Sequence, residues 1–299
     1  MSQSSTEKKD PLVERLCAEE GPDRTYYALG TMLGADDFQD EQLYHRGRLA
    51  RALAYLFGAG TVAGLEIAFK AGTKPGSSAR APENDELTVS AGLAIDPFGR
   101  LIEVPRHACI RLQRWFDGQD QGVLAGAVHS GKAVAWLFAR YRPCERGRTP
   151  VIAEGPFDAT NATAPSRLRD GYELRLFLDG APDEPTFARK GATGADHLIP
   201  ALREPLGGAD SAGRIRSLQD AILAGWGRPI DMKDDAGWVL LGRVDVPTVL
   251  SGGARRYGVE TLPADAPIID NYLRPFVYGA WALALEGGLP LPAKIKNTP

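Results

Sequence analysis

The stretch from Gly34 to Pro105 constrains the fold most, because it combines the signals of one long helix with those of one tight hairpin. The helix is expected to begin at Asp36 or Asp37, since either can act as N-cap and Gln39 follows Asp36 by three residues, as in a capping box. Its expected end is Gly58, which follows the last apolar pair as a C-terminal glycine does.

The hairpin follows the helix after a polar loop. Two apolar runs, Leu87–Ile95 and Leu101–Val104, flank the sequence Asp96-Pro97-Phe98-Gly99. Proline and glycine stand there at the positions that a tight turn favours, so the two runs are predicted to pair as neighbouring strands.

The rest of the chain alternates apolar and polar residues in short runs, which is typical of β-structure. Further strands are predicted at Val62–Phe69, Lys132–Tyr141, Tyr172–Leu178 and Trp238–Val246, and helices at Asp210–Trp226 and at Ile268–Glu286, the latter interrupted at Pro275. The last strand begins as a continuous apolar run and is expected to be central in a sheet. The stretch Arg142–Arg169 is expected to be irregular. The predicted fold class is α+β: an N-terminal helix plus β-hairpin module, then a β-rich domain with flanking helices.

Glycine-rich and polar stretches suggest where the chain divides. The expected organisation is a flexible N-terminal segment (1–24), a helix and β-hairpin attachment module (25–117), a linker (118–131), a β-rich domain with two helices (132–290) and a tail (291–299).

Composition excludes several classes of function. The 35 basic and 38 acidic residues are mixed along the chain and give a net charge of −3, which argues against nucleic acid as the main partner. The 3 cysteines are widely spaced, which fits neither a disulfide framework nor a zinc site. The N-terminus lacks the apolar core of a signal peptide, and the apolar run Phe276–Leu285 is too short to span a bilayer. A cytoplasmic protein without a membrane span is expected.

No motif indicates catalysis, a cofactor or a metal. The segment Gly126–Ala133 matches the letters of a phosphate-binding loop, but Ala133 replaces the hydroxyl that holds magnesium, and a strand is expected where a helix should follow. The histidines form no metal-binding pair by spacing: they are His45, His107, His129 and His197. We therefore expect a protein that is not an enzyme.

One stripe of the predicted long helix has the spacing of a coiled-coil seam. It comprises Phe38, Gln42, His45, Leu49, Leu53 and Leu56. Polar side chains at seam positions fix the register and number of strands in an oligomer. The stripe therefore predicts self-association, and the alternative is a single amphipathic helix that packs on its own domain.

The segment from Tyr27 to Pro105 resembles the N-terminal attachment regions of tail-fibre and baseplate-associated proteins of phage tails and phage-like contractile injection systems. The matching residues are Gly30, Met32, Leu33, Asp37, Phe38, Glu41 and Gln42; then Gly58, Gly60, Val62, Gly64, Leu65, Glu66 and Ile67; then the run from Leu87 to Pro105. The resemblance implies a structural component of a phage-tail-like particle that forms a homo-oligomer, with a trimer as the first guess, and binds baseplate or tail proteins. A fibre shaft and a receptor-binding tip are not recognisable, which favours a baseplate component or fibre adaptor.

Two surfaces are candidates for docking to such partners. One is the hairpin turn with Asp96, Phe98 and Arg100, and the other is the Arg167, Arg169 and Asp170 segment, whose basic residues favour an acidic partner surface. A solvated loop is the alternative for the second.

The competing function is a soluble carbohydrate- or ligand-binding β-domain protein. Its candidate stacking residues are Trp115, Tyr141 and Trp238. Aromatic residues of this kind more often belong to a core.

Overall fold

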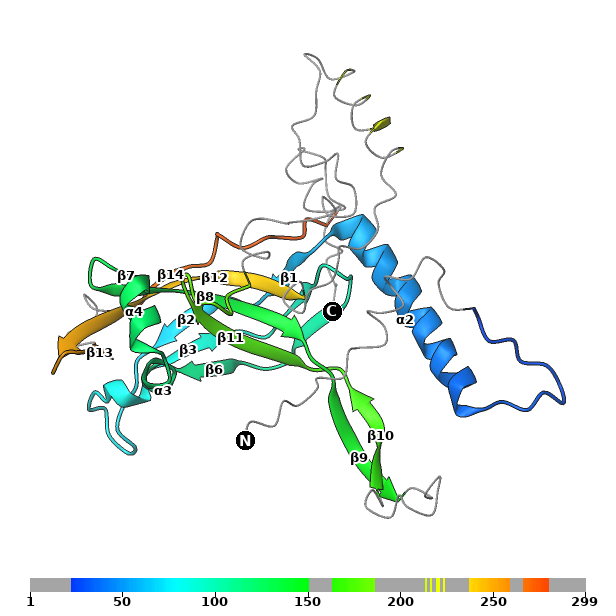
Figure 1. Cartoon of the computed structure of the whole chain (residues 1–299), viewed down its shortest axis with the longest axis horizontal. Coiled ribbons are helices and arrows are strands. Elements are labelled where there is room, and N and C mark those ends of the chain that lie inside the picture. The colour runs from blue at the N-terminus through cyan, green and yellow to red at the C-terminus, as the bar shows by residue number, and fades with distance from the viewer. Residues whose placement is uncertain are drawn as a thin grey trace, which may run out of the picture.

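The computed structural model describes residues 23–150, 163–185, 237–258 and 266–279, together with residues 213, 216, 219, 220 and 223. Within them one long helix is followed by strands in several sheets and a few short helices (Figure 1). The fold is therefore α+β and rich in β-structure, as the sequence predicts.

The long helix, α2, spans Ala35–Phe57. Its N-cap residue is Gly34, whose N–H donates to the Asp37 carboxylate at 2.7 Å, so the acid caps from inside the first turn. The helix ends where Gly58 adopts a φ of 69° and donates its N–H to the Ala54 carbonyl at 3.0 Å. The predicted end at Gly58 is confirmed.

Two small sheets follow α2. The first has the order β1-β4-β5 and the second β2-β3-β6. Their strands are β1 (Gly60–Gly64), β2 (Ile67–Lys70), β3 (Glu86–Val89), β4 (Gly92–Ile95), β5 (Leu101–Val104) and β6 (Ala108–Arg111). The hairpin of β4 and β5 is the predicted one, and its turn closes with the Gly99 N–H on the Asp96 carbonyl at 2.9 Å.

Each of two predicted strands proves to be a pair of strands in different sheets. The run 62–69 divides between β1 and β2, and the run 87–95 between β3 and β4. Both divide at the same place: Leu65 has a φ of 59°, and its N–H contacts the carbonyl of Ala91 at 3.4 Å. Gly64 and Gly92 face the opposite backbone so closely that a Cβ there would lie 2.1 and 2.3 Å from a carbonyl oxygen.

A segment near the C-terminus holds this division in place. Arg274 is buried, donates to the Leu65 carbonyl at 2.6 Å, and has a pKa that burial lowers to about 10. Asn271 accepts the N–H of Ile67 and donates to its carbonyl, each at 2.9 Å. The unusual backbone of Leu65 is thus fixed by side chains more than 200 residues away along the chain.

The largest sheet has the order β11-β8-β12-β13, and two short strands also pair with its inner strands, β7 with β8 and β14 with β12. Its strands are β7 (Val128–His129), β8 (Lys132–Tyr141), β11 (Tyr172–Leu178), β12 (Trp238–Ser251), β13 (Ala254–Tyr257) and β14 (Ile268–Asp270). The predicted strands at 132–141 and 172–178 are confirmed residue for residue, and β12 lies inside the sheet as expected.

The helix predicted to begin at Ile268 is wrong at its start. Residues 268–270 form β14, which pairs with β12 through Ile268 and Asp245. Pro267 and Pro275 flank the segment and disfavour helical backbone on either side. Residues 280–286 lie outside the described residues, as does most of the helix predicted at 210–226, of which the described positions are helical.

Short helices cover one end of the sheets. They are η1 (Pro82–Asn84), α3 (Leu112–Asp117) and α4 (Gln121–Ala127). The segment expected as a linker therefore contains α4, which Asp120 caps by accepting the N–H groups of Gly122 and Val123 at 2.8 and 3.0 Å. One hydrophobic cluster includes Leu87, Leu124 and Leu137, and thus residues from both sides of 118–131.

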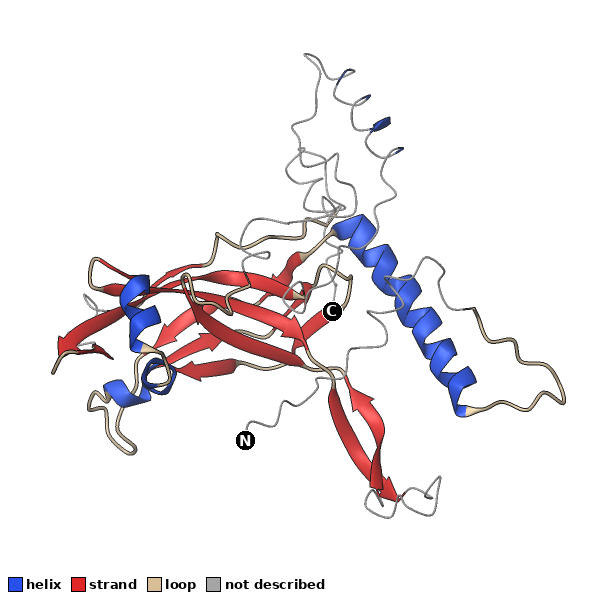
Figure 2. Ribbon diagram, viewed as in Figure 1, coloured by secondary structure: helices blue, strands red, loops and turns tan. Residues whose placement is uncertain are grey.

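A separate hairpin, which we call the arm, consists of β9 (Cys144–Pro150) and β10 (Thr163–Arg169). It forms a two-stranded sheet of its own and projects from the body of the molecule (Figure 2). The expectation of irregular structure here is wrong for the described residues. An exposed hairpin has no apolar face, and therefore lacks the alternation by which strands are recognised.

Candidate assembly surfaces

The helix α2 contacts the body through one face of its C-terminal half. Its fully buried residues are Ala50 and Ala54. Gly99 lies so close to Ala50 that a Cβ would come within 1.8 Å of the Ala50 carbonyl oxygen. Arg46 adds a hydrogen bond to the Tyr141 hydroxyl at 3.1 Å. The N-terminal half of α2 runs away from the sheets (Figure 1).

The stripe predicted for self-association lies on a different face of α2. Phe38 is 49% exposed, Leu49 56% and Leu56 74%. Gln42 and His45 are also exposed, whereas Leu53 is half-buried. The face with Ala50 and Ala54 thus binds the body and leaves most of the stripe uncovered.

The segment before α2 adds apolar surface near the start of the helix. Leu29 and Met32 are almost fully exposed. Thr25 donates to the Asp37 carbonyl at 2.9 Å, and the Tyr27 hydroxyl bonds to Glu41, so the segment lies beside the first turns of α2.

The β4–β5 turn, one of the two predicted docking surfaces, lies inside the protein. Asp96 is fully buried and accepts the N–H groups of Phe98 and Arg100 at 2.9 and 2.8 Å. The Arg100 Nε lies 2.6 Å from the second Asp96 oxygen, and its side chain is only 10% exposed. Phe98 is buried beneath the Arg100 guanidinium, which stacks at 4.8 Å from the ring centroid. These side chains bind the turn to its own chain and offer a partner little surface.

The second predicted docking surface belongs to the arm, and all its members are exposed. Arg167 and Arg169 lie on β10, and Asp170, directly after it, accepts a hydrogen bond from the Tyr141 hydroxyl at 2.6 Å. Sequence reasoning missed their neighbours across the hairpin, Arg146 and Arg148. The signal was present: arginines at alternate positions in both segments have the period of a strand.

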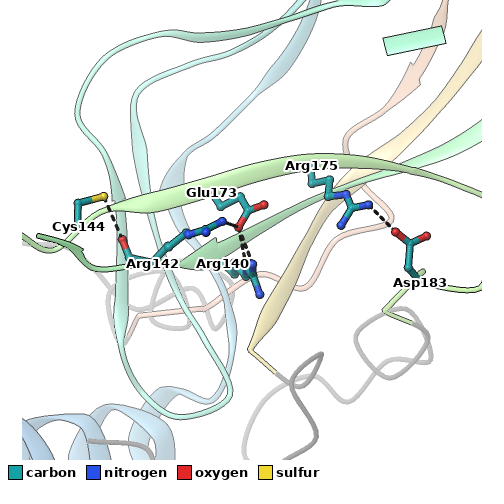
Figure 3. Close-up of polar contacts among 6 residues, drawn as sticks. All are labelled: Arg140, Arg142, Cys144, Glu173, Arg175 and Asp183. Carbon is teal, nitrogen blue, oxygen red and sulfur yellow. Dashed lines mark hydrogen bonds and ion pairs between the residues drawn. The ribbon is translucent and has the colours of Figure 1, made fainter. Parts of the chain in front are cut away.

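The arginines at the base of the arm differ from those on it, because each has an acidic partner (Figure 3). Arg140 and Arg142 lie 2.7 and 2.8 Å from the same Glu173 oxygen. Arg175 pairs with Asp183. Partial burial opposes ionisation of Glu173, but the hydrogen bonds from Arg140 and Arg142 outweigh it and lower its pKa.

The three aromatic residues considered for ligand stacking belong to the interior. Trp238 and Tyr141 are buried. Trp115 is half-buried and donates its Nε1–H to the Leu176 carbonyl at 2.8 Å. Trp238 packs edge-on against Phe177, with ring centroids 5.3 Å apart. None of the three presents a ring face as an open platform.

The remaining motifs carry no site in the described residues. A strand, β8, begins at Lys132 as predicted, so the phosphate-loop-like letters do not precede a helix. Within the described ranges no three His, Cys, Asp or Glu side chains form a group that could hold a metal ion. His197 lies outside the described residues. No helix in the described part of the chain is long and apolar enough to cross a membrane.

No protein-family model and no curated protein matches this sequence. Among solved structures, the chain is similar to a chain of the baseplate complex from the type VI secretion system, with a TM-score of 0.29 and 13% identity over 55% of this chain and 51% of that one. It is also similar to the crystal structure of TssK, with a TM-score of 0.27 and 15% identity over 68% of this chain and 54% of that one. The match thus spans about half the length of each of these two solved chains.

Proposed function

We propose that the chain is a non-enzymatic structural component of a phage-tail-like particle, a baseplate component or fibre adaptor that acts by self-association and docking. The observation that carries the proposal is the uncovered apolar stripe on α2. Large apolar side chains at Phe38, Leu49 and Leu56 stand on a helix whose other face is already engaged with the body. Large apolar side chains left exposed along one face of a helix are typical of an interaction site.

The length of α2 is sufficient for the helix to pack along the symmetry axis of an oligomer. A helix of 23 residues is about 35 Å long, enough for several layers of seam contacts with other copies. Gln42 and His45 occupy exposed positions within the stripe. Polar residues at a seam select one register and one number of strands at some cost in stability, and we expect a trimer.

The particle context of the proposal comes from the sequence. The resemblance to attachment regions of tail-fibre and baseplate-associated proteins covers 27–105, which includes α2 and the β4–β5 hairpin. Baseplate or tail proteins are therefore the proposed partners, and assembly from the cytoplasm into a particle is the proposed location. Neither a cofactor nor nucleic acid has a role in this function.

The competing ligand-binding function gains no support. Its proposed stacking residues are buried or half-buried in the body, where Trp115 and Tyr141 are also hydrogen-bonded. A stacking platform requires an accessible ring face.

Self-association is tested by light scattering on the purified chain. We expect a closed oligomer for the wild type and a lower mass for Leu49→Asp, because a charge at a seam position cannot be buried without a partner. The matched control is Gln39→Asp, which adds the same charge at an exposed position on the same helix, about 100° around it from Phe38 and about 80° from Leu49. Circular dichroism verifies that both variants keep their helix. An unchanged mass for Leu49→Asp, or a monomeric wild type, contradicts self-association through the stripe.

Particle membership needs a separate experiment. An antibody against the chain is used to follow it through sedimentation of a lysate from the native cells. Co-sedimentation with intact particles is expected, and recovery solely in the low-mass fractions contradicts the proposal.

A further inference from the structure

The arm presents a surface that we call the arginine face. Its members are Arg146 and Arg148 on β9, and Arg167 and Arg169 on β10. Arg167 lies directly opposite Arg146, and residues two apart on a strand share a face, so the four guanidinium groups extend from the same side of the hairpin. The acidic residues of this region, Glu145 and Asp170, occupy alternate positions and belong to the other side.

The arginines of this face differ from those at the base of the arm, where carboxylates of the same chain neutralise the positive charges. Arg140 and Arg142 share Glu173, whereas among the described residues no ion pair joins the four arginines of this face to a carboxylate. Like charges directly opposite each other on neighbouring strands are destabilising. Arg146 and Arg167 are such a pair.

The arm also lacks the packing that an independent sheet needs. All residues of β9 are exposed, and no third strand from the described part of the chain pairs with this sheet. A two-stranded hairpin alone is at best marginally stable in water. An unsupported hairpin with repelling charges is the expected form of a segment that a partner covers.

We propose that the arginine face binds the acidic start of α2 in a second copy of the chain; this inference rests on the proposed self-association. The acidic start comprises Asp36, Asp37, Asp40 and Glu41. The four carboxylates are thus equal in number to the four guanidinium groups and opposite to them in charge. Their spacing also agrees, because residues two apart on a strand are separated by about 6.7 Å and residues four apart on a helix by about 6 Å. Charge-assisted pairs between Arg and carboxylate are the strongest available to such surfaces.

The acidic start and the apolar stripe are compatible on the same helix. At 100° per residue, Asp36 and Asp40 each lie about 160° around α2 from Phe38. One copy can therefore offer its stripe to the seam and its acidic start to an arm. Asp36 and Asp37 lie in the first turn, where the helix dipole favours acidic side chains, whereas Asp40 and Glu41 lie beyond it, and Glu41 accepts a hydrogen bond from the Tyr27 hydroxyl.

The test uses two charge-reversed forms of the full chain. The arm variant carries Arg146→Glu and Arg167→Glu, and the helix variant carries Asp36→Lys and Asp40→Lys. Each alone is expected to weaken association at least tenfold in sedimentation equilibrium, and added salt is expected to weaken the wild type in the same direction. Mixing the two variants under different fluorescent labels is expected to restore association between them, because the arm of one then matches the helix of the other. Ser166→Glu, on the opposite side of the same hairpin, is the control that should leave association unchanged.

The outcomes separate this inference from the proposed function. If the wild type and both variants associate equally while Leu49→Asp does not, the arm contact is overturned and self-association through the stripe stands. If both variants are weakened but mixing fails to restore association, the arginine face binds something other than a second copy's α2, and the inference is overturned. A monomeric wild type contradicts both proposals.

Discussion

Two hairpins of this protein, β4–β5 and the arm, both carry arginine, but the turn of the first is buried and the strands of the second are exposed. The β4–β5 turn places Arg100 inside the structure, paired with Asp96 and stacked on Phe98. The arm places Arg146 and Arg167 in solvent, opposite each other, with no acidic partner among the described residues. The sequence offers the β4–β5 turn and the Arg167, Arg169 and Asp170 segment as candidate docking surfaces, and of these two the structure leaves the second accessible.

The difference in burial between the two hairpins arises from the uncharged side chains on their strands. In β4 and β5, alternate residues such as Ala94, Ile102 and Val104 are fully buried and fasten the hairpin to the core. The arm offers no such row, since β9 is exposed throughout and Leu168 of β10 is 66% exposed. Apolar alternation therefore decides whether a charged turn stabilises the fold or remains available to a partner.

The largest difference between the hairpins is expected on removal of one charged group. Asp96→Ala leaves Arg100 buried without its carboxylate and two backbone N–H groups without their acceptor. A loss of about 3–5 kcal/mol in the free energy of unfolding is expected. In the dissociated chain, Arg167→Ala on the arm should change it by less than about 0.5 kcal/mol. Urea denaturation of both variants measures this contrast, and a comparable loss for the two would show that the hairpins do not differ as described.

A smaller contrast is expected between two glycines with left-handed backbone. Gly99 has a φ of 78° and Gly147 a φ of 61°, so alanine is strained at both. At Gly99 the added Cβ would also meet the Ala50 carbonyl at 1.8 Å, whereas at Gly147 it meets the Ser166 hydroxyl, which can rotate away. Gly99→Ala is expected to cost about 2–4 kcal/mol and Gly147→Ala about 1 kcal/mol. Thermal unfolding that ranks Gly147→Ala as the more damaging change would contradict the close contact of the turn with α2.

Sequence patterns predicted the parts of the fold that local residues determine. The strands at 132–141 and 172–178 are recognisable from their own apolar residues, and the end of α2 from Gly58. The division of two strands between sheets was not predictable, because it depends on Arg274 and Asn271, far away in the chain.

The candidate surfaces were predictable to a similar extent. Heptad spacing identified the α2 stripe, and the structure adds that its neighbouring face is the one that packs. Nothing local distinguishes a buried Asp96 from an exposed Arg167. The burial of the β4–β5 turn requires the contact between Gly99 and Ala50, two residues that only the folded chain brings together.

The smallest expected effect concerns the base of the arm and its pH dependence. The pKa of Glu173 lies below its ordinary value of 4.5, because hydrogen bonds from Arg140 and Arg142 outweigh the cost of partial burial. A carboxyl with a lowered pKa in the folded state stabilises the fold above its unfolded pKa, and that contribution is lost as the pH falls through the folded pKa. Glu173→Gln should therefore lower the free energy of unfolding by up to about 1 kcal/mol at pH 7, the range of partly exposed ion pairs.

The pH dependence of the free energy of unfolding should distinguish the paired arginines at the base of the arm from the arginine face. Below pH 4.5 the difference between Glu173→Gln and wild type should shrink, since the wild-type carboxyl itself becomes protonated. Because Arg146 and Arg167 have no acidic partner among the described residues, replacing both with Gln should leave the pH dependence of the dissociated chain unchanged. Denaturation at a series of pH values, at protein concentrations below the dissociation constant of the oligomer, measures both curves. A pH-dependent loss for the arm variant under these conditions would mean that its arginines already pair within one copy, which would remove the distinction between the paired base and the unpaired face.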